Sequence, residues 1–171
     1  ALAGVLALAI ALSPALAASP GDGSDHQLEQ LTRVFASLDV RDMDGRRWTR
    51  ADLTGRVVVL DFWATWCAPC LAEIPHLRRL QADFGADRVQ VLGVSLDASD
   101  RRTLVSWLNR QRVSWPQVWD GRAYDGTLAE RFGVASLPTS VLVGPDGRVR
   151  PPALLAAALL AAVAALLGLA R

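Results

Sequence analysis

The chain has 171 residues, which is enough for one hydrophobic core of ordinary size and leaves no room for a second domain. Its 18 basic residues nearly balance its 17 acidic residues, and no basic block occurs, so the charge pattern argues against a nucleic-acid-binding protein. Apolar residues make up 51% of the chain because they accumulate at its two ends.

The first 17 residues have the pattern of a secretory signal peptide. Residues 1–12 form an apolar run, Ser13-Pro14 interrupts it, and Ala15-Leu16-Ala17 has the small-x-small pattern of a signal-peptidase site. An uncleaved signal anchor is the alternative interpretation. Either one predicts export, to the periplasm or to the outer face of the cytoplasmic membrane.

A change in composition marks the start of the folded domain. Residues 18–26 are small, polar and rich in Gly and Pro, which predicts a flexible linker. We therefore expect the domain to occupy residues 27–150. It should begin with a short hairpin, in which residues 37–40 and 47–49 flank a turn-rich spacer.

Strands and helices alternate through the rest of the domain. Apolar runs predict buried strands at 57–63, 89–96 and 139–143. Apolar residues at intervals of three and four predict helices at 68–84, 100–111 and 128–132, with a kink at Pro75 in the first. A turn at 144–147 should add a last antiparallel strand at 148–150. This order predicts an α/β fold with a largely parallel sheet.

The C-terminal segment, residues 151–171, is an apolar helix candidate without a polar face. Residues 153–170 consist only of Ala, Leu, Val and Gly. At ~1.5 Å per residue, this length just reaches across a bilayer core of ~30 Å. A membrane anchor is the favoured interpretation, and a domain helix or a truncated or out-of-frame gene end are the alternatives.

The two cysteines, Cys67 and Cys70, stand three residues apart after a predicted buried strand and at the start of a predicted helix. Backbone N–H groups and the helix dipole at this place favour a thiolate, so Cys67 is the expected nucleophile. Cys70, one turn further along, is then placed to attack the resulting mixed disulfide. Pro69 suits the first helical turn because it has no N–H group to leave unbonded.

Two cysteines also occur in other kinds of site. A zinc site needs two further ligands, and the only histidines are His26 and His76. A copper chaperone could combine both thiolates with His76, and a structural disulfide across four residues would add little stability. Cys67 lacks the surrounding Pro and Thr/Ser pattern of a peroxiredoxin. We expect no resident metal or other cofactor.

The run Asp61-Phe-Trp-Ala-Thr-Trp-Cys-Ala-Pro-Cys70, followed by Glu73 and Pro75, resembles the active-site signature of the TlpA/ResA branch of thioredoxin-like proteins. These are membrane-anchored or periplasmic disulfide reductases, several of which serve cytochrome c maturation. The resemblance continues through residues 133–139 and 141–149. It implies a thioredoxin-like three-layer α/β/α fold with a mixed central sheet, in which residues 97–119 form an insert that shapes partner choice.

The resemblance also implies roles for individual residues. Pro138 would be a cis-proline facing the two cysteines, and Leu137 would offer its backbone to an extended substrate segment. Asp61 matches a buried acid that moves a proton to or from the resolving cysteine, although Gly93 stands where thioredoxins have a lysine partner for this acid. The remaining candidates for substrate contact are Trp66, Ala68, Pro69 and Glu73. Glu73 is equally well interpreted as a charge on the helix surface.

The sequence therefore predicts a protein-disulfide reductase. Its partners would be disulfide-containing exported proteins and an upstream thiol donor, expected to be a membrane protein, and either apolar end could associate the chain with the membrane. A disulfide oxidase of the cell envelope is the second hypothesis, because the same CxxC geometry serves either direction and the reduction potential decides between them. A copper-binding or inactive thioredoxin-like module is the third.

Overall fold

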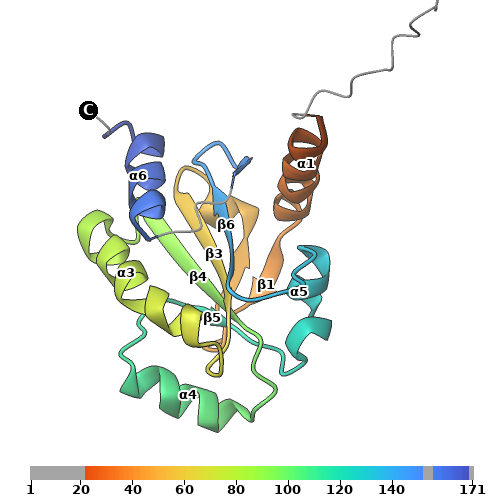
Figure 1. The fold of residues 1–171 in the computed structure, drawn as a ribbon, viewed down its shortest axis with the longest axis vertical. Helices are drawn as coiled ribbons and strands as arrows, with labels where there is room; N and C mark the ends of the chain where they lie inside the picture. The colour runs from red at the N-terminus through yellow and green to blue at the C-terminus, as the bar shows by residue number, and fades with distance from the viewer. Residues whose placement is uncertain (1–21, 152–155, 170–171) are drawn as a thin grey trace, which may run out of the picture.

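The computed structural model describes residues 22–151 and 156–169. The signal-peptide prediction for residues 1–17 lies outside them. Five strands form one sheet in the order β5-β4-β3-β6-β7 (Figure 1). The strands are β3 (Val57–Trp63), β4 (Val89–Ser95), β5 (Gln117–Val118), β6 (Thr139–Val143) and β7 (Val149–Arg150).

The sheet is mixed, as the family resemblance implies, and the order of strands and helices does not predict the antiparallel β6. β3, β4 and β5 are parallel to one another, whereas β6 runs antiparallel to β3 and β7 antiparallel to β6. β3 lies at the centre and is buried along its whole length. Val58, Leu60 and Phe62 belong to one hydrophobic cluster, and Val57 and Val59 belong to the other. This two-sided burial explains the continuous apolar run in the sequence.

The predicted N-terminal hairpin is present as β1 (Asp39–Arg41) and β2 (Arg47–Thr49), which pair antiparallel as a separate small sheet. Asp42 stabilises its turn, because its carboxylate accepts hydrogen bonds from the backbone N–H groups of Asp44 and Arg46. The short helix α2 (Arg50–Leu53) follows and is capped by Thr49 and Asp52.

Helices cover both faces of the sheet. In Figure 1, α3 (Ala68–Phe84) and α6 (Ala156–Leu166) lie on one side, and α1 (Asp22–Ala36) and α5 (Thr127–Arg131) lie on the other. This layering is the predicted α/β/α arrangement. The predicted insert, residues 97–119, contains α4 (Arg101–Arg110) and the edge strand β5, so it extends the sheet rather than forming a loop. A 3₁₀ turn, η1 (Ala123–Asp125), precedes α5.

Helix α1 corrects the predicted start of the domain. Residues 22–26 are its first turns, so the prediction of a flexible linker at 18–26 is wrong for this part, and residues 18–21 lie outside the described ranges. Leu28 and Leu31 pack against the main hydrophobic cluster and hold the helix on the sheet. Asp25 lies in its first turn, where negative charge is favourable.

Helix α6 lies within the apolar C-terminal segment, for which the sequence favours a membrane anchor. Leu159 and Val163 are buried in the cluster that also contains Leu80 of α3 and Val57 and Val59 of β3. This is the packing of a domain helix, the alternative to the favoured membrane anchor. Within the described ranges, none of the helices combines the length and the apolarity that crossing a bilayer requires.

Candidate active site

Cys67 and Cys70 are joined in a disulfide at the start of α3. Cys67 is the N-cap residue of this helix, and its sulfur accepts a hydrogen bond from the backbone N–H of Cys70 at 3.3 Å. Both cysteine side chains are almost fully buried. The neighbouring Trp66 is 60% exposed, so the site presents one large apolar side chain to solvent directly beside the disulfide.

The other predicted contact residues also lie at the surface. Ala68 and Pro69 are exposed on the first turn of α3, and Pro138 is exposed in the loop before β6. The peptide bond between Leu137 and Pro138 is cis, which confirms the predicted geometry. Leu137 packs against the cluster that contains both cysteines. The fold therefore brings this loop to the CxxC motif from more than 60 residues away.

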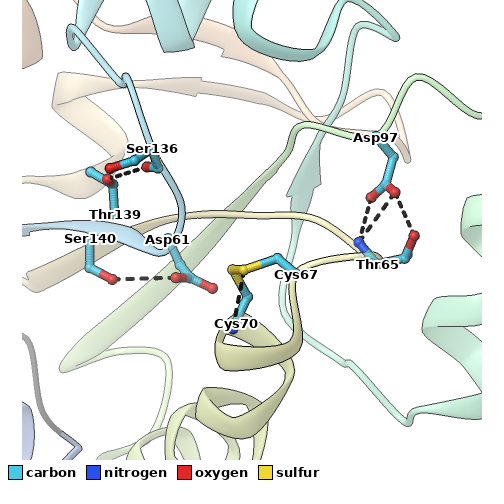
Figure 2. The surroundings of a disulfide bond; sticks show 8 residues. All are labelled: Asp61, Thr65, Cys67, Cys70, Asp97, Ser136, Thr139 and Ser140. Atoms are coloured by element: carbon cyan, nitrogen blue, oxygen red, sulfur yellow. Dashed lines mark hydrogen bonds between the residues drawn. A yellow bond between two sulfur atoms is a disulfide. The ribbon is translucent and has the colours of Figure 1, made fainter.

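Asp61 is the buried acid of the site. It lies in β3, is 6% exposed, and faces Ser140 of β6 in the antiparallel register. Burial raises its pKa to about 7, a hydrogen bond from Ser140 Oγ to Asp61 Oδ1 at 3.3 Å opposes that rise, and the negative charge of Glu73 adds to it. In Figure 2 the carboxylate points toward the disulfide. A carboxyl group with this pKa can accept or release a proton near neutral pH.

Glu73 influences Asp61 through its charge. It is half-buried on α3, one turn beyond Cys70, and its charge disfavours the ionised form of Asp61. The two interpretations that the sequence leaves open, a substrate contact and a charge on the helix surface, both allow this effect on Asp61.

Gln117 occupies the place where a basic partner of Asp61 would stand, and sequence reasoning missed it. Gly93 is paired with Asp61 across β3 and β4, and a side chain at Gly93 would collide with the Gln117 amide, whose oxygen lies 2.2 Å from the ideal Cβ position. Trp63 Nε1 donates to Gln117 Oε1 at 2.9 Å and holds the amide in place. Gln117 carries no charge, and burial is the dominant influence on the pKa of Asp61.

A second residue that sequence reasoning missed is Asp97, which follows β4. Its buried carboxylate accepts hydrogen bonds from Thr65, two residues before Cys67. The only signal for it in the sequence is a polar residue directly after an apolar strand, which is common at strand ends. Its contact with Thr65 depends on the parallel pairing of β3 with β4.

The histidines considered as metal ligands are both exposed. His26 lies on α1 and His76 on α3. Across the described residues, no three or more His, Cys, Asp or Glu side chains come together in a way that could hold a metal ion.

Residues 31–151 match the AhpC/TSA family. The chain belongs to this family. Among curated proteins, the thiol-disulfide oxidoreductase ResA of Bacillus thuringiensis (strain Al Hakam) is 31% identical over 127 residues, which cover 74% of this chain and 70% of the relative. ResA of Bacillus subtilis (strain 168) is 31% identical over 110 residues, covering 64% and 59%.

Solved structures of disulfide oxidoreductases also resemble this AhpC/TSA family member. A secreted Mycobacterium tuberculosis disulfide oxidoreductase homologous to E. coli DsbE has a TM-score of 0.62 and 25% identity, covering 78% of this chain and 98% of that one. A thiol-disulfide oxidoreductase from Bacteroides fragilis has a TM-score of 0.60 and 26% identity, covering 71% and 93%. With the Cys67–Cys70 pair, these likenesses identify the protein as a thiol–disulfide oxidoreductase with a thioredoxin-like fold.

Proposed function

We propose that this oxidoreductase works as a reductase of disulfides in exported proteins, apocytochromes c among them, on the outer side of a membrane. The charge around the disulfide supports this direction of the reaction, the reduction of substrate disulfides rather than their formation. The Asp61 carboxylate points toward the disulfide (Figure 2) and is influenced by the negative charge of Glu73, and the hydrogen bonds and ion pairs of the described residues place no arginine or histidine against either sulfur.

This charge pattern favours the disulfide form of the protein. Strongly oxidising members of such folds owe their high potential to a stabilised thiolate in the reduced form. A carboxylate near Cys67 and Cys70, that of Asp61 in its ionised form, opposes a thiolate, so the reduced form gains less and passes its electrons on more readily. The residues between the cysteines, Ala68 and Pro69, add no positive charge.

The reaction proceeds through two exchanges. The Cys67 thiolate attacks a substrate disulfide, a Cys67–substrate bond forms, and one substrate thiolate leaves. Cys70 then loses its proton to Asp61 and attacks the Cys67 sulfur, which releases the second substrate thiolate and closes the Cys67–Cys70 disulfide. The substrate gains the two electrons that the dithiol loses. Asp61 gives the Cys70 proton to one substrate thiolate, and the other takes up from solvent the proton that Cys67 released when it ionised.

Exposed residues form the proposed docking surface. Trp66, Ala68 and Pro69 surround the covered Cys67 sulfur, and the backbone of Leu137 offers strand-like pairing to an extended substrate segment. The closed disulfide must be reduced again after each turnover. We propose a membrane protein with a dithiol as the donor, since the signal at residues 1–17 would separate the domain from cytoplasmic reductants.

The reduction potential tests the direction. Equilibration of the protein with glutathione redox buffers, followed by thiol trapping, should give a value of about −270 mV. A value of about −120 mV would instead identify an oxidase.

Trapping tests the substrates. Cys70→Ser leaves the mixed disulfide unresolved, so exported proteins should be recovered bound to Cys67. The double variant Cys67→Ser/Cys70→Ser is the matched control and should recover none. If folded Cys70→Ser protein in the envelope traps no partner beyond this control, the proposed reductase role is wrong.

A further inference from the structure

The turn of residues 64–67 connects the central strand to the active-site helix. β3 ends at Trp63, and the backbone N–H of Cys67 donates to the carbonyl of Ala64 at 3.1 Å to close the turn. α3 begins immediately afterwards, with Cys67 as its N-cap. The conformation of this turn therefore decides where the Cys67 sulfur lies relative to the N–H groups of the helix.

Asp97 binds this turn from the neighbouring strand. Its carboxylate accepts hydrogen bonds from the backbone N–H of Thr65, at 3.2 Å to Oδ1 and 3.0 Å to Oδ2, and from Thr65 Oγ1 at 2.5 Å. Figure 2 shows the hydrogen bonds from the N–H and the hydroxyl group of Thr65 on the side of Cys67 away from Asp61. The two residues are 32 positions apart in the chain, so the bond joins the carboxyl ends of β3 and β4.

Asp97 is itself firmly placed. It is only 2% exposed, and its Oδ2 accepts a hydrogen bond from Ser95 Oγ at 2.8 Å. Its backbone carbonyl accepts one from Trp119 Nε1 at 2.8 Å. Burial of a carboxylate is costly unless several donors compensate it, and here the N–H group of Thr65 and the hydroxyl groups of Thr65 and Ser95 do so. If the residue at this position only had to fill space in the core, an apolar side chain would give a more stable protein.

We propose that Asp97 is a positioning residue for Cys67, and that through Thr65 it keeps the turn of residues 64–67 in place when the active-site disulfide opens. In the oxidised protein the covalent bond to Cys70 tethers Cys67 to α3. Reduction removes this tether, so the link from Thr65 to Asp97 has to hold the N-cap. The inference rests on the attack by Cys67 described under the proposed function.

A displaced turn weakens the thiolate. The hydrogen bond from the Cys70 N–H to the Cys67 sulfur and the helix dipole both act only at short range and in the correct orientation. Loss of the Thr65 anchor should therefore make Cys67 less reactive near neutral pH. The charge of Asp97 has the opposite effect. Removal of a nearby negative charge favours the thiolate and should make Cys67 more reactive.

Alkylation of the reduced protein by iodoacetamide measures Cys67 directly. The rate is followed as a function of pH, and peptide mass identifies the alkylated cysteine. In Thr65→Val and in Asp97→Asn, the midpoint of the pH profile should move to higher pH. The rate at neutral pH should fall about threefold to tenfold, the size of a lost helix-terminus interaction. Thr65→Ser keeps the hydroxyl group and should react like the native protein.

The chain offers a matched control in Asp100 and Thr103. Asp100 Oδ1 accepts from the backbone N–H of Thr103 at 3.0 Å, and Asp100 Oδ2 accepts from Thr103 Oγ1 at 2.7 Å. This is the same Asp–Thr pair, but it is exposed and caps α4. Asp100→Asn and Thr103→Val should lower stability as other lost caps do and should leave the alkylation profile of Cys67 unchanged.

Two results would overturn the inference. In one, folded Thr65→Val and Asp97→Asn both alkylate with the native pH profile. In the other, only Asp97→Asn changes and its Cys67 becomes more reactive, which would show a charge effect without positioning. Alkylation of the native protein tests the proposed function separately. If Cys70 rather than Cys67 is alkylated there, the assignment of Cys67 as the attacking residue is wrong.

Discussion

Asp61 and Ser140 face each other across the antiparallel pair of β3 and β6, and the Ser140 hydroxyl donates to Asp61 Oδ1 at 3.3 Å. This is the only hydrogen bond that the side chain of Asp61 makes among the described residues. A buried carboxylate with one neutral donor and a second acid, Glu73, nearby is poorly stabilised in its charged form. The active site therefore contains an acid that titrates near neutral pH.

The first prediction concerns stability and pH. Burial raises the pKa of Asp61 to about 7 from the ordinary value of 3.8, so the folded protein holds this proton more tightly than the unfolded chain does. The resulting stability is complete below about pH 4 and is lost as the pH rises through about 7. Through this group, the oxidised protein should lose about 2–4 kcal/mol of unfolding free energy across that interval.

Urea unfolding of the native protein and of Asp61→Asn over a series of pH values measures this loss. Acids with a lowered pKa, such as Asp52 and Asp100, affect both proteins equally, so the difference between the two isolates Asp61. The native protein should become less stable relative to Asp61→Asn as the pH rises. A difference that is constant across the whole range would contradict the raised pKa.

The second prediction concerns the two neighbours of Asp61. Glu73→Gln removes a negative charge and should lower the pKa of Asp61, whereas Ser140→Ala removes a hydrogen bond to the carboxylate and should raise it. Carboxyl ¹³C chemical shifts as a function of pH report both changes. Asp83→Asn, on the same helix but paired with Arg79 at the surface, is the control and should leave Asp61 unchanged. Shifts of the same sign in the two variants would refute the assignment.

The third prediction concerns Trp66. Because this side chain is 60% exposed, Trp66→Ala should change the free energy of unfolding by no more than about 0.5 kcal/mol. If Trp66 contacts the substrate, KM for a protein disulfide should rise about tenfold, as when an interface tryptophan is removed. The rate with a small aromatic disulfide serves as the control and should stay at the native value. An unchanged KM would remove Trp66 from the docking surface.

The fourth prediction concerns α6. Val163 is fully buried against the sheet, so Val163→Ala should cost about 1–3 kcal/mol of unfolding free energy through lost contacts and a new cavity. Ala165, on the exposed side of the same helix, provides the control, since Ala165→Ser should stay within about 0.5 kcal/mol of the native protein. Equal, negligible effects of both substitutions in denaturant melts would show that α6 does not belong to the domain core.

The sequence by itself determined the central strand, the active-site helix and the reacting atoms, but not helix α1, whose first turns it predicts as a linker. The apolar run of β3, the periodicity of α3 and the two cysteines between them are local patterns, because a strand, a helix and a CxxC motif are each encoded within a few consecutive residues. The final hairpin and the α/β class follow from the same patterns. The cis bond before Pro138 came from a family resemblance, and the structure confirms it.

Only the tertiary structure decided what surrounds the cysteines. Thr65 and Asp97 are 32 residues apart, and Asp61 and Ser140 are 79 apart, so their contacts depend on strand pairing that local periodicity does not encode. The place of α6 depended on packing for another reason. A helix that is apolar on every side suits lipid and a protein core alike, so the sequence leaves its place open, and the structure packs it in the cluster that contains Val57, Val59 and Leu80.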